Sequence, residues 1–320
     1  MAKLDNPGYP SYLGADLDLL AKEAEKMLAC CAICPRRCQV NRLKNQRGFC
    51  KTGVLAKVST FLAHHGEEPP ISAKFGSGTI FFSHCNMSCI YCQNYPFSQE
   101  GEGKEVTPVE LASFMLELQK IGCHNINLVT PTHVMPQILK ALSIAVPQGL
   151  KIPLVYNSGG YELASVIKFL EGVVDIYLPD MRYSDSSMAV EYSSAPNYPK
   201  YNQEAVKEMH RQVGIANIDN QGIIKRGLVI RHLVLPHGIA GTQKIMKFIA
   251  QELSPDTYVS LMSQYHPYYR AFALGELNRA LTHEEYENAK LDMEKYGLHN
   301  GWIQEEGGLE RLAGIHLKAI

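Results

Sequence analysis

Three cysteines lie close together in the segment HCNMSCIYCQN, which covers residues 84–94. They are Cys85, Cys89 and Cys92, separated by three and then two residues. A closed zinc or iron–sulfur site takes four protein ligands, so three thiolates leave one metal position free. A free position is where a further ligand binds and reacts. The spacing predicts an open, reactive metal centre. The alternatives are a small zinc knuckle that His84 closes, or buried thiols without metal.

A second group of cysteines precedes the first. It contains Cys31, Cys34, Cys38 and Cys50, and eight of the nine cysteines lie between Cys30 and Cys92. Clustered cysteines in a reducing compartment indicate metal more than disulfides. Four thiolates make a closed set, which favours a structural role. Either zinc or a [4Fe–4S] cluster fits that number of ligands.

Composition narrows the class of protein. The 320 residues include 31 basic and 32 acidic side chains, for a net charge of −1, so charge gives no reason to expect nucleic acid. No apolar run reaches the ~18 residues of a membrane span, so no membrane partner is expected. The first 20 residues lack the apolar core of a signal peptide. We therefore predict a cytoplasmic protein.

The reactive residues need a scaffold, and the sequence from about residue 79 alternates between two patterns. Short apolar runs typical of buried strands are each followed by helical spacing of apolar residues. The predicted strands cover 79–83, 126–130, 152–157, 173–179, 227–236 and 258–265. The predicted helices that follow them cover 107–121, 134–145, 161–171, 202–213, 242–253 and 282–297. Six such units predict an α/β fold with parallel strands, either a barrel or an open sheet.

Polar side chains follow the predicted strands at the point where each one ends. After the first strand come the three cysteines, and later strands end in the segments TPTH (130–133), NSGG (157–160) and PDMR (179–182). The carboxyl ends of parallel strands meet at one edge of a sheet or barrel, where active sites form. We therefore expect these segments to converge.

The cysteine segment resembles the radical S-adenosylmethionine (SAM) superfamily. The pattern there is Cys-x3-Cys-x-aromatic-Cys, which Cys85, Cys89, Tyr91 and Cys92 match. The resemblance implies a [4Fe–4S] cluster that reductively cleaves SAM to a 5′-deoxyadenosyl radical, which then abstracts hydrogen from a substrate. It also implies a partial (β/α)6 barrel.

A narrower resemblance covers most of the chain, from Cys31 to about His266. The sequence is similar to uncharacterised iron–sulfur proteins related to pyruvate formate-lyase-activating enzyme. The segments that carry this likeness are CAICPRRCQVNRLKNQRGFC, GEEPPIS, GSGTIFFSHCNMSCIYCQN, NLVTPTH, YNSGGYE and RHLVLP. The implied substrate is a glycine of a partner protein. A small molecule or a peptide is the alternative, and a non-catalytic iron–sulfur electron carrier is a third reading.

The resemblance also implies contacts to SAM. Ser158, Asp180 and Arg182 take the places of family elements beside SAM and a monovalent cation, with Arg182 standing where the family has lysine. An Asp or Ser at a strand end is also a common helix cap. Arg231 lies inside an apolar strand and needs a partner there. The full predicted SAM-binding set is Tyr91, Thr130, Thr132, Asn157, Ser158, Asp180, Arg182 and Arg231.

Three regions are expected. Residues 1–75 form an N-terminal helix and the Cys-rich metal-binding module, 76–270 the partial barrel, and 271–320 a helical extension. The implied chemistry needs a low-potential electron donor of the flavodoxin or ferredoxin type. Residues 36–51 carry six basic side chains and no acidic one. They make either a docking surface for such a donor or a solvated face that offsets the thiolates' charge.

Overall fold

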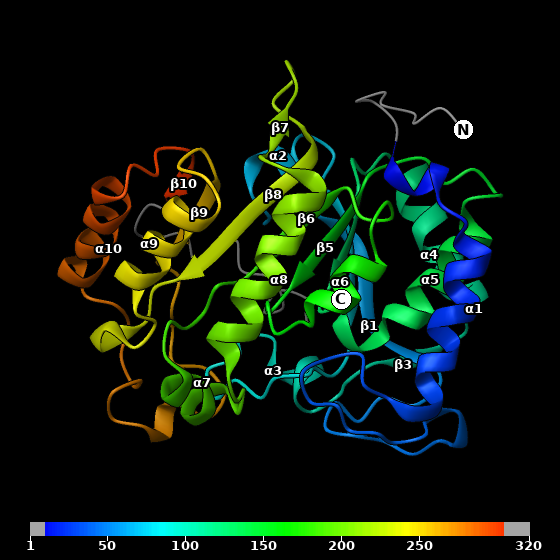
Figure 1. Cartoon of the computed structure of the whole chain (residues 1–320), viewed down its shortest axis with the longest axis horizontal. Helices are drawn as coiled ribbons and strands as arrows, with labels where there is room; N and C mark the ends of the chain where they lie inside the picture. The colour runs from blue at the N-terminus through cyan, green and yellow to red at the C-terminus, as the bar shows by residue number, and fades with distance from the viewer. Residues whose placement is uncertain (1–9, 304–320) are drawn as a thin grey trace.

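The computed structural model describes residues 10–303 and shows a mixed α/β protein built on one ten-stranded sheet (Figure 1). The strands are β1 (Ala56–His64), β2 (Ser77–Phe82), β3 (Lys104–Val106), β4 (Ile126–Val129), β5 (Leu154–Ser158), β6 (Ile176–Pro179), β7 (Asn217–Ile218), β8 (Ile224–Leu233), β9 (Tyr258–Met262) and β10 (Gly301–Ile303). The helices are α1 (Leu17–Lys26), α2 (Pro69–Ser72), α3 (Tyr95–Ser98), α4 (Pro108–Lys120), α5 (Met135–Ala145), α6 (Ala164–Phe169), α7 (Ser186–Ser193), α8 (Tyr198–Val213), α9 (Thr242–Glu252) and α10 (His283–Lys295).

The six predicted strand-and-helix units are all present. Their strands are β2, β4, β5, β6, β8 and β9, and each is followed along the chain by its helix. The sequence did not reveal β1, β3, β7 or β10, nor the helix α7 in the long connection after β6. Local signals at the helix ends agree with the structure. At α4, for example, Thr107 and Glu110 form a reciprocal capping box and Pro108 occupies the first turn.

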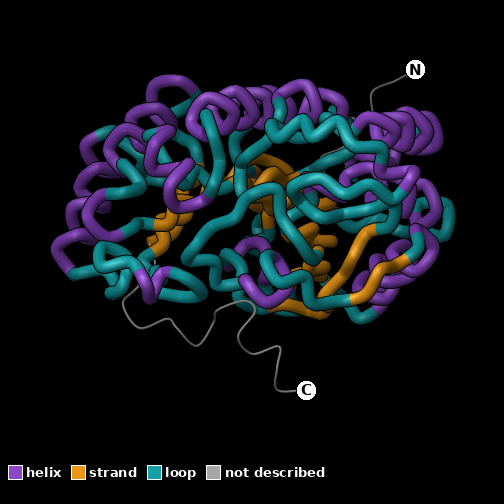
Figure 2. The backbone as a smooth tube through the Cα atoms, turned by 90° about the horizontal axis from the view of Figure 1, so that it is seen from below, coloured by secondary structure: helices purple, strands orange, loops and turns teal. Residues whose placement is uncertain are grey.

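The order of the parallel strands determines where the helices lie. Strands β2, β4, β5, β6, β8 and β9 are neighbours in chain order and run parallel. Because each right-handed crossover advances in the same direction, the helices are placed on one face of the sheet. Seen from below, the strands form an arc with helices along its outer side and loops across its open side (Figure 2).

Further strands extend both edges of this parallel core. Strand β1 pairs antiparallel with β2, and β3 pairs with β1. At the other edge β10 pairs parallel with β9. The N-terminal region therefore contributes β1 to the same sheet as the six units, and the C-terminal region contributes β10. The predicted division into three regions stays a prediction, and residues 304–320 of the expected extension lie outside the described residues.

Side chains alternate between the two faces of the arc, as the period of a strand requires. In β6, Tyr177 belongs to the large core beneath the helices, whereas Ile176 and Leu178 belong to a separate apolar cluster. Val155 belongs to that second cluster, which also contains Ile71 of α2. Helix α2 therefore packs on the inner, concave face, opposite the outer layer of helices.

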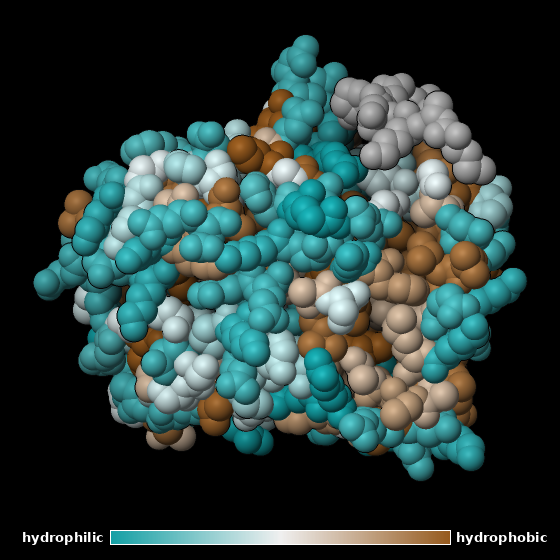
Figure 3. Space-filling view, in the orientation of Figure 1, coloured by the Kyte–Doolittle hydropathy of each residue, from teal (hydrophilic) through white to brown (hydrophobic). Residues whose placement is uncertain are grey.

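The outer surface differs across the molecule. Hydrophilic residues cover most of the left half of the face shown in Figure 3, and apolar residues gather on the right, over the part that holds α5 and α6 in Figure 1. Among residues 10–303, the helices are all too short or too polar to cross a bilayer.

Candidate functional site: an open cysteine loop at the strand ends

The three cysteines Cys85, Cys89 and Cys92 lie on the loop between β2 and α3. Cys89 is buried, whereas Cys85 and Cys92 are half-buried. Each sulfur has a polar neighbour. The backbone N–H of Met87 donates to Cys85 Sγ at 3.3 Å, and the Ser193 hydroxyl donates to Cys89 Sγ at 3.0 Å. Cys92 Sγ lies 3.1 Å from the hydroxyl oxygen of Ser98. Such contacts stabilise sulfur that carries negative charge.

Backbone hydrogen bonds from distant segments fix the loop. Ser88 N–H donates to Ser193 O at 3.0 Å, and Ile90 N–H donates to Tyr192 O at 3.0 Å, both at the end of α7. Arg270 N–H donates to Ile90 O at 2.8 Å. The cysteine loop is thus held by segments about 100 and 180 residues further along the chain, and its shape does not depend on local sequence alone.

Burial disfavours the charged thiolate form of two of these cysteines, Cys85 and Cys92. Burial, with a smaller contribution from Cys89, raises the pKa of Cys92 to about 11 and raises the pKa of Cys85 further. Metal coordination would deprotonate them. Among residues 10–303, no group of three His, Cys, Asp or Glu side chains is close enough to hold a single metal ion. Each iron of a [4Fe–4S] cluster binds its own thiolate, so the ligands of a cluster need not converge on one point.

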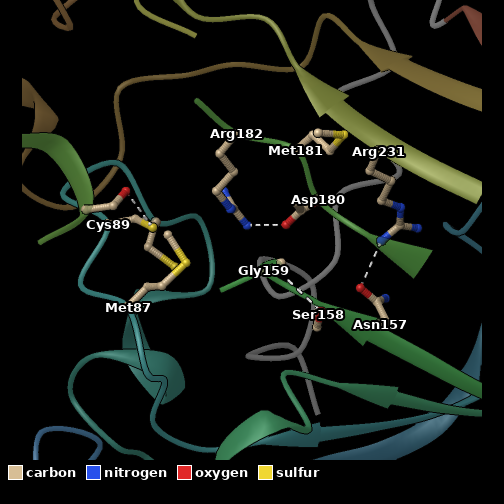
Figure 4. A network of polar contacts seen from close by, with 12 residues as sticks. Met87, Cys89, Asn157, Ser158, Gly159, Asp180, Met181, Arg182 and Arg231 are labelled. Carbon is tan, nitrogen blue, oxygen red and sulfur yellow. Dashed lines mark hydrogen bonds and ion pairs between the residues drawn. The ribbon is translucent and has the colours of Figure 1, made fainter. Parts of the chain in front are cut away.

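The ends of β5 and β6 lie beside this loop (Figure 4). Asp180 forms an ion pair with Arg182 through Nη2, and both side chains are largely buried. A Cβ atom added at Gly159 would lie 3.1 Å from Met87 Sδ and 3.9 Å from Arg182 Nε. The absence of a side chain at Gly159 therefore keeps a space open between the cysteine loop, β5 and Arg182.

Arg182 retains unused hydrogen-bonding capacity. Its Nε is buried and has no partner among residues 10–303. Its charge lowers the pKa of Cys85 and Cys92, although burial and Cys89 outweigh it. A buried, unpaired donor on a cation is costly unless an acceptor reaches it. A carboxylate-bearing ligand that binds above the cysteine loop would be such an acceptor.

The backbone beneath Arg182 is fixed by α8. The Tyr198 hydroxyl donates to Asp180 O at 3.0 Å, and Arg182 N–H donates to the same hydroxyl at 3.0 Å. Asn202 Nδ2 donates to Asp180 O at 2.9 Å and to Gly160 O at 3.0 Å. Asp180 therefore holds its turn through its carbonyl oxygen, which leaves its carboxylate for Arg182.

Arg231 on β8 has different partners. Its Nε donates to Glu68 Oε1 at 2.7 Å and its Nη2 to Glu68 Oε2 at 2.6 Å, a bidentate pair. Nη2 also pairs with Glu67, and Nη1 donates to Asn157 Oδ1 at 3.3 Å. Burial raises the pKa of Glu67, but Arg231 and then His64 outweigh burial and lower it to about 2. Arg231 is thus held by two carboxylates of the GEEPPIS segment on the inner face of the sheet.

The two predicted threonines are placed differently from each other. Thr130 has a positive φ of 61°, and its N–H donates to Asn157 O at 2.8 Å, so it lies at the strand ends. Thr132 is buried, and its hydroxyl donates to the carboxylate of Glu162. Burial raises the pKa of Glu162 to about 7, against the effect of hydrogen bonds from Thr132 and Ser158. The hydroxyls of Thr132 and Ser158 are therefore engaged by a buried carboxyl group.

Tyr91 belongs to a hydrogen-bonded chain that ends on the cysteine loop. Its hydroxyl lies 2.6 Å from that of Tyr183, which lies 2.7 Å from the Ser193 hydroxyl, the donor to Cys89. The Tyr91 ring is buried and meets Tyr265 edge-on at 5.8 Å. In this arrangement Tyr91 positions the loop, and its predicted contact with SAM stays a prediction.

The second group of cysteines surrounds one cavity. Cys31, Cys34, Cys38 and Cys50 all line it, and further lining residues are Ile33, Arg36, Val40, Arg42, Gly48 and His133. Burial raises the pKa of Cys34 to about 12. A Cβ atom at Gly48 would lie 2.7 Å from Cys38 Sγ, so the chain must have glycine where it passes this cysteine.

Buried donors in this cavity point to an anionic occupant. Arg42 is 1% exposed, and its Nη1 donates to His133 O at 2.8 Å and lies 3.9 Å from Cys31 Sγ. Within the part of the chain that the structure describes, Arg42 Nη2 and His133 Nδ1 are buried without a partner. Among the described residues no carboxylate pairs with Arg42, and a buried cation without a counter-charge is strongly destabilising. Four metal-bound thiolates would supply the missing negative charge, so the cavity fits a metal centre.

The basic run of residues 36–51 is only partly a surface. Arg42 is buried in the cysteine cavity, and Arg36 is half-buried with its guanidinium bonded to backbone carbonyls. Arg47 is exposed and pairs with Glu105. The remaining basic side chains are exposed, and they are Arg37, Lys44 and Lys51. The charged face is therefore smaller than the sequence suggested.

Several residues that build the site were not singled out from sequence. Glu162, Ser193, Tyr198 and Asn202 have ordinary sequence contexts, and only their contacts reveal them. Glu67 and Glu68 lie in the GEEPPIS segment, and their partner Arg231 is more than 160 residues away. The NSGG segment did offer a signal, because adjacent glycines mark a close approach of backbone.

Comparison with known proteins places the chain in a family. It is 34% identical over 292 residues to the uncharacterized protein MJ0674 of Methanocaldococcus jannaschii, a match that covers 88% of this chain and 79% of that protein. No family model matches. The fold and the site define a mixed α/β protein with an open cysteine loop at its strand ends. The chain belongs to the family of MJ0674.

Two solved structures overlap with the chain more distantly. A radical SAM methyltransferase from Sphaerobacter thermophilus shares 13% identity at a TM-score of 0.44, over 72% of this chain and 67% of that one. SuiB of Streptococcus suis bound to S-adenosylmethionine shares 12% identity at a TM-score of 0.49. That match covers 70% of this chain and 48% of SuiB.

Proposed function

We propose that this chain is a radical SAM enzyme with a partial (β/α)6 barrel. The observation that carries the proposal is the set of three thiols, Cys85, Cys89 and Cys92, on a loop that leaves β2 beside the ends of β5 and β6. A [4Fe–4S] cluster on these thiolates, with SAM on its free iron, would supply a 5′-deoxyadenosyl radical that removes hydrogen from the substrate. An electron carrier would need no such polar space next to its cluster.

The chain's own residues then bind and orient the cofactor. Arg182 offers its Nε, which no described residue binds, and its pair with Asp180 keeps the guanidinium facing the loop. Gly159 leaves room between Met87 and Arg182. Thr130 offers backbone and hydroxyl oxygens at the strand ends. A monovalent cation beside Asp180 stays a prediction. Arg182 already supplies a positive charge at that carboxylate.

We propose a small molecule or a peptide as substrate in preference to a glycine of a folded partner. The GEEPPIS segment supports this choice, because Glu68, Pro70 and Ile71 are buried and Ile71 packs on the inner face of the sheet. This segment fills part of the space inside the arc. A folded protein that delivers a glycine loop needs an open side, whereas a small substrate fits a closed pocket.

The reduction requires an external donor. We propose a flavodoxin or ferredoxin, whose acidic surface would meet the exposed Arg37, Lys44 and Lys51. These side chains lie on the Cys-rich segment. The N-terminal site is then the metal centre nearest to the donor, with either a second [4Fe–4S] cluster or zinc on its four thiolates.

The test is anaerobic reconstitution with iron and sulfide, followed by SAM and a strong reductant. We expect 5′-deoxyadenosine from the wild type and none from the Cys85→Ala/Cys89→Ala/Cys92→Ala variant. Cys123→Ala is the matched control, because this buried thiol lies outside both groups. Undiminished cleavage by the triple variant would contradict the proposal. Candidate substrates are then screened in deuterated form for transfer of deuterium into 5′-deoxyadenosine.

A further inference from the structure

The N-terminal cysteine cavity and the Cys85 loop are in direct contact. We infer that the N-terminal site holds a redox-active iron–sulfur cluster that passes electrons to the Cys85–Cys89–Cys92 centre. The inference rests on the function proposed above and adds to it the route by which the open centre is reduced.

The first connection is Arg36. It lines the cavity that the four N-terminal cysteines surround. Its Nε donates to the carbonyl oxygen of Asn86 at 2.9 Å, and Asn86 directly follows Cys85. Its Nη2 donates to the carbonyl oxygen of Ser194, which follows the Ser193 whose hydroxyl donates to Cys89. One side chain therefore joins the cavity to the residue that follows Cys85 and to the residue that follows the hydrogen-bond donor of Cys89.

Asn86 also contacts Cys85 through its side chain. It is 2% exposed, its Nδ2 donates to Tyr161 O at 2.7 Å, and its Oδ1 lies 3.8 Å from Cys85 Sγ. The Arg36 guanidinium also lies over the rings of Phe49, at 3.6 Å, and Tyr161, at 5.3 Å. Arg36 is thus held by two aromatic rings and by hydrogen bonds at its polar atoms.

The second connection is His133. This buried ring lines the same cavity, and its Nε2 lies 2.9 Å from Ser83 O, two residues before Cys85. Its Nδ1 has no partner among the described residues. A histidine whose second nitrogen binds a backbone carbonyl is oriented as side chains at metal centres commonly are. The two sites therefore share two short hydrogen-bonded paths.

These contacts favour a relay over a purely structural metal. A structural ion needs only to tie its own segment together, and its closed ligand set would do so without contacts to a second centre. Here the paths end at the backbone around Cys85 and Cys89. The step transfers one electron and changes no bond. A reduced flavodoxin or ferredoxin loses the electron, the N-terminal cluster gains and then loses it, and the open cluster is reduced.

The experiment separates two routes of reduction in the reconstituted protein. Reduced flavodoxin serves as the protein donor, and Ti(III) citrate serves as a small donor that diffuses to the half-buried open centre. Rapid freeze-quench electron paramagnetic resonance follows reduction of each cluster without SAM. For Arg36→Gln we expect flavodoxin-driven reduction of the open cluster to slow at least tenfold, with Ti(III)-driven reduction and iron content unchanged. Arg36→Lys should recover part of the rate.

Arg211→Gln is the matched control, because this exposed arginine of α8 forms its ion pairs with Glu171 and Glu208. Cys50→Ser is the second variant if Arg36→Gln does not fold. For it we also expect flavodoxin-driven reduction of the open cluster to slow while Ti(III)-driven reduction stays unchanged. Equal loss of both routes would mean that Arg36 is structural, and unchanged rates would mean that the path is not used. Zinc in place of iron in the triple cysteine variant would also overturn the relay. None of these outcomes affects SAM cleavage by the Ti(III)-reduced wild type, which tests the proposed function separately.

Discussion

Arg182 and Arg231 both reach the inner side of the strand ends, yet their polar partners differ. Arg231 is enclosed by the carboxylates of Glu67 and Glu68, so its charge is fully used inside the protein. Among the described residues, Arg182 has one carboxylate partner, Asp180, and keeps a buried Nε without an acceptor. Both arginines belong to the SAM-binding set that was predicted from sequence. The contacts separate them into one that closes the inner face and one that remains available to a ligand.

The largest effect is expected on the Arg231 side. Arg231→Met should lower the free energy of unfolding by about 3–5 kcal/mol, because it leaves two buried carboxylates without a counter-charge. Chemical denaturation measures this loss. The variant Arg231→Met/Glu67→Gln/Glu68→Gln should recover much of it, since the buried charges are then removed together. A loss below ~1 kcal/mol in the single variant would contradict the view that Arg231 closes the inner face.

On the Arg182 side, the stability of the fold should instead depend on how closely the backbone packs at Gly160. A Cβ atom at Gly160 would lie 2.1 Å from Asp180 O and 2.3 Å from Asn202 Nδ2, and Gly160 has a φ of +72°. Gly160→Ala should therefore cost about 1–3 kcal/mol from crowding, beyond the ~1–2 kcal/mol of the left-handed backbone. Gly172→Ala is the control, because its φ is +79° with no atom within 4 Å of the added Cβ. Equal melting temperatures of the two variants would exclude the close approach.

The affinity for SAM should depend on Arg182. Arg182→Gln should weaken SAM binding to the reconstituted protein at least tenfold, or about 1.4 kcal/mol, because a charged hydrogen bond is lost. The fold should persist, since the Asp180 backbone is held by Tyr198 and Asn202. Equilibrium dialysis with labelled SAM measures the affinity. If the affinity is unchanged, Arg182 does not bind the cofactor.

The smallest effect is a dependence on pH. Arg231 and His64 hold the pKa of Glu67 at about 2, against the effect of burial, whereas an unfolded glutamate titrates near pH ~4.3. A lowered pKa in the folded state stabilises the fold above the unfolded pKa, and this contribution is lost as the pH falls toward 2. The stability difference between wild type and Glu67→Gln should therefore shrink from pH 5 to pH 3. A difference that stays constant would contradict the pairing.

The scaffold was largely predictable because its signals are local. Buried apolar runs such as TIFFS and IPLVYN and the helices after them follow from periodicity and end signals. Strand β1 was missed because its sequence, AKVSTFLAH, is only partly buried and pairs with β2 as an added antiparallel strand.

The site was less predictable because its decisive contacts are between distant residues. The strand ends converge as parallel topology requires, so Asp180 and Arg182 could be placed beside the cysteine loop. Nothing near Arg231 in the sequence indicates that the carboxylates of Glu67 and Glu68 pair with its guanidinium. Likewise, the burial of Arg42 against the four-cysteine cavity depends on the backbone around His133.

The ion pair between Arg231 and the GEEPPIS segment also has a consequence for how the chain folds during synthesis. Glu67 and Arg231 are separated by 164 residues, so the glutamates leave the ribosome long before their partner exists. Until β8 is made, both carboxylates must remain hydrated, and α2 has only part of the surface on which it packs. Contacts this far apart in sequence form late and slow the folding of a domain. The nascent chain can therefore assemble its first strands early, but it cannot seal their inner face until translation has passed Arg231, more than two thirds of the way along the 320 residues.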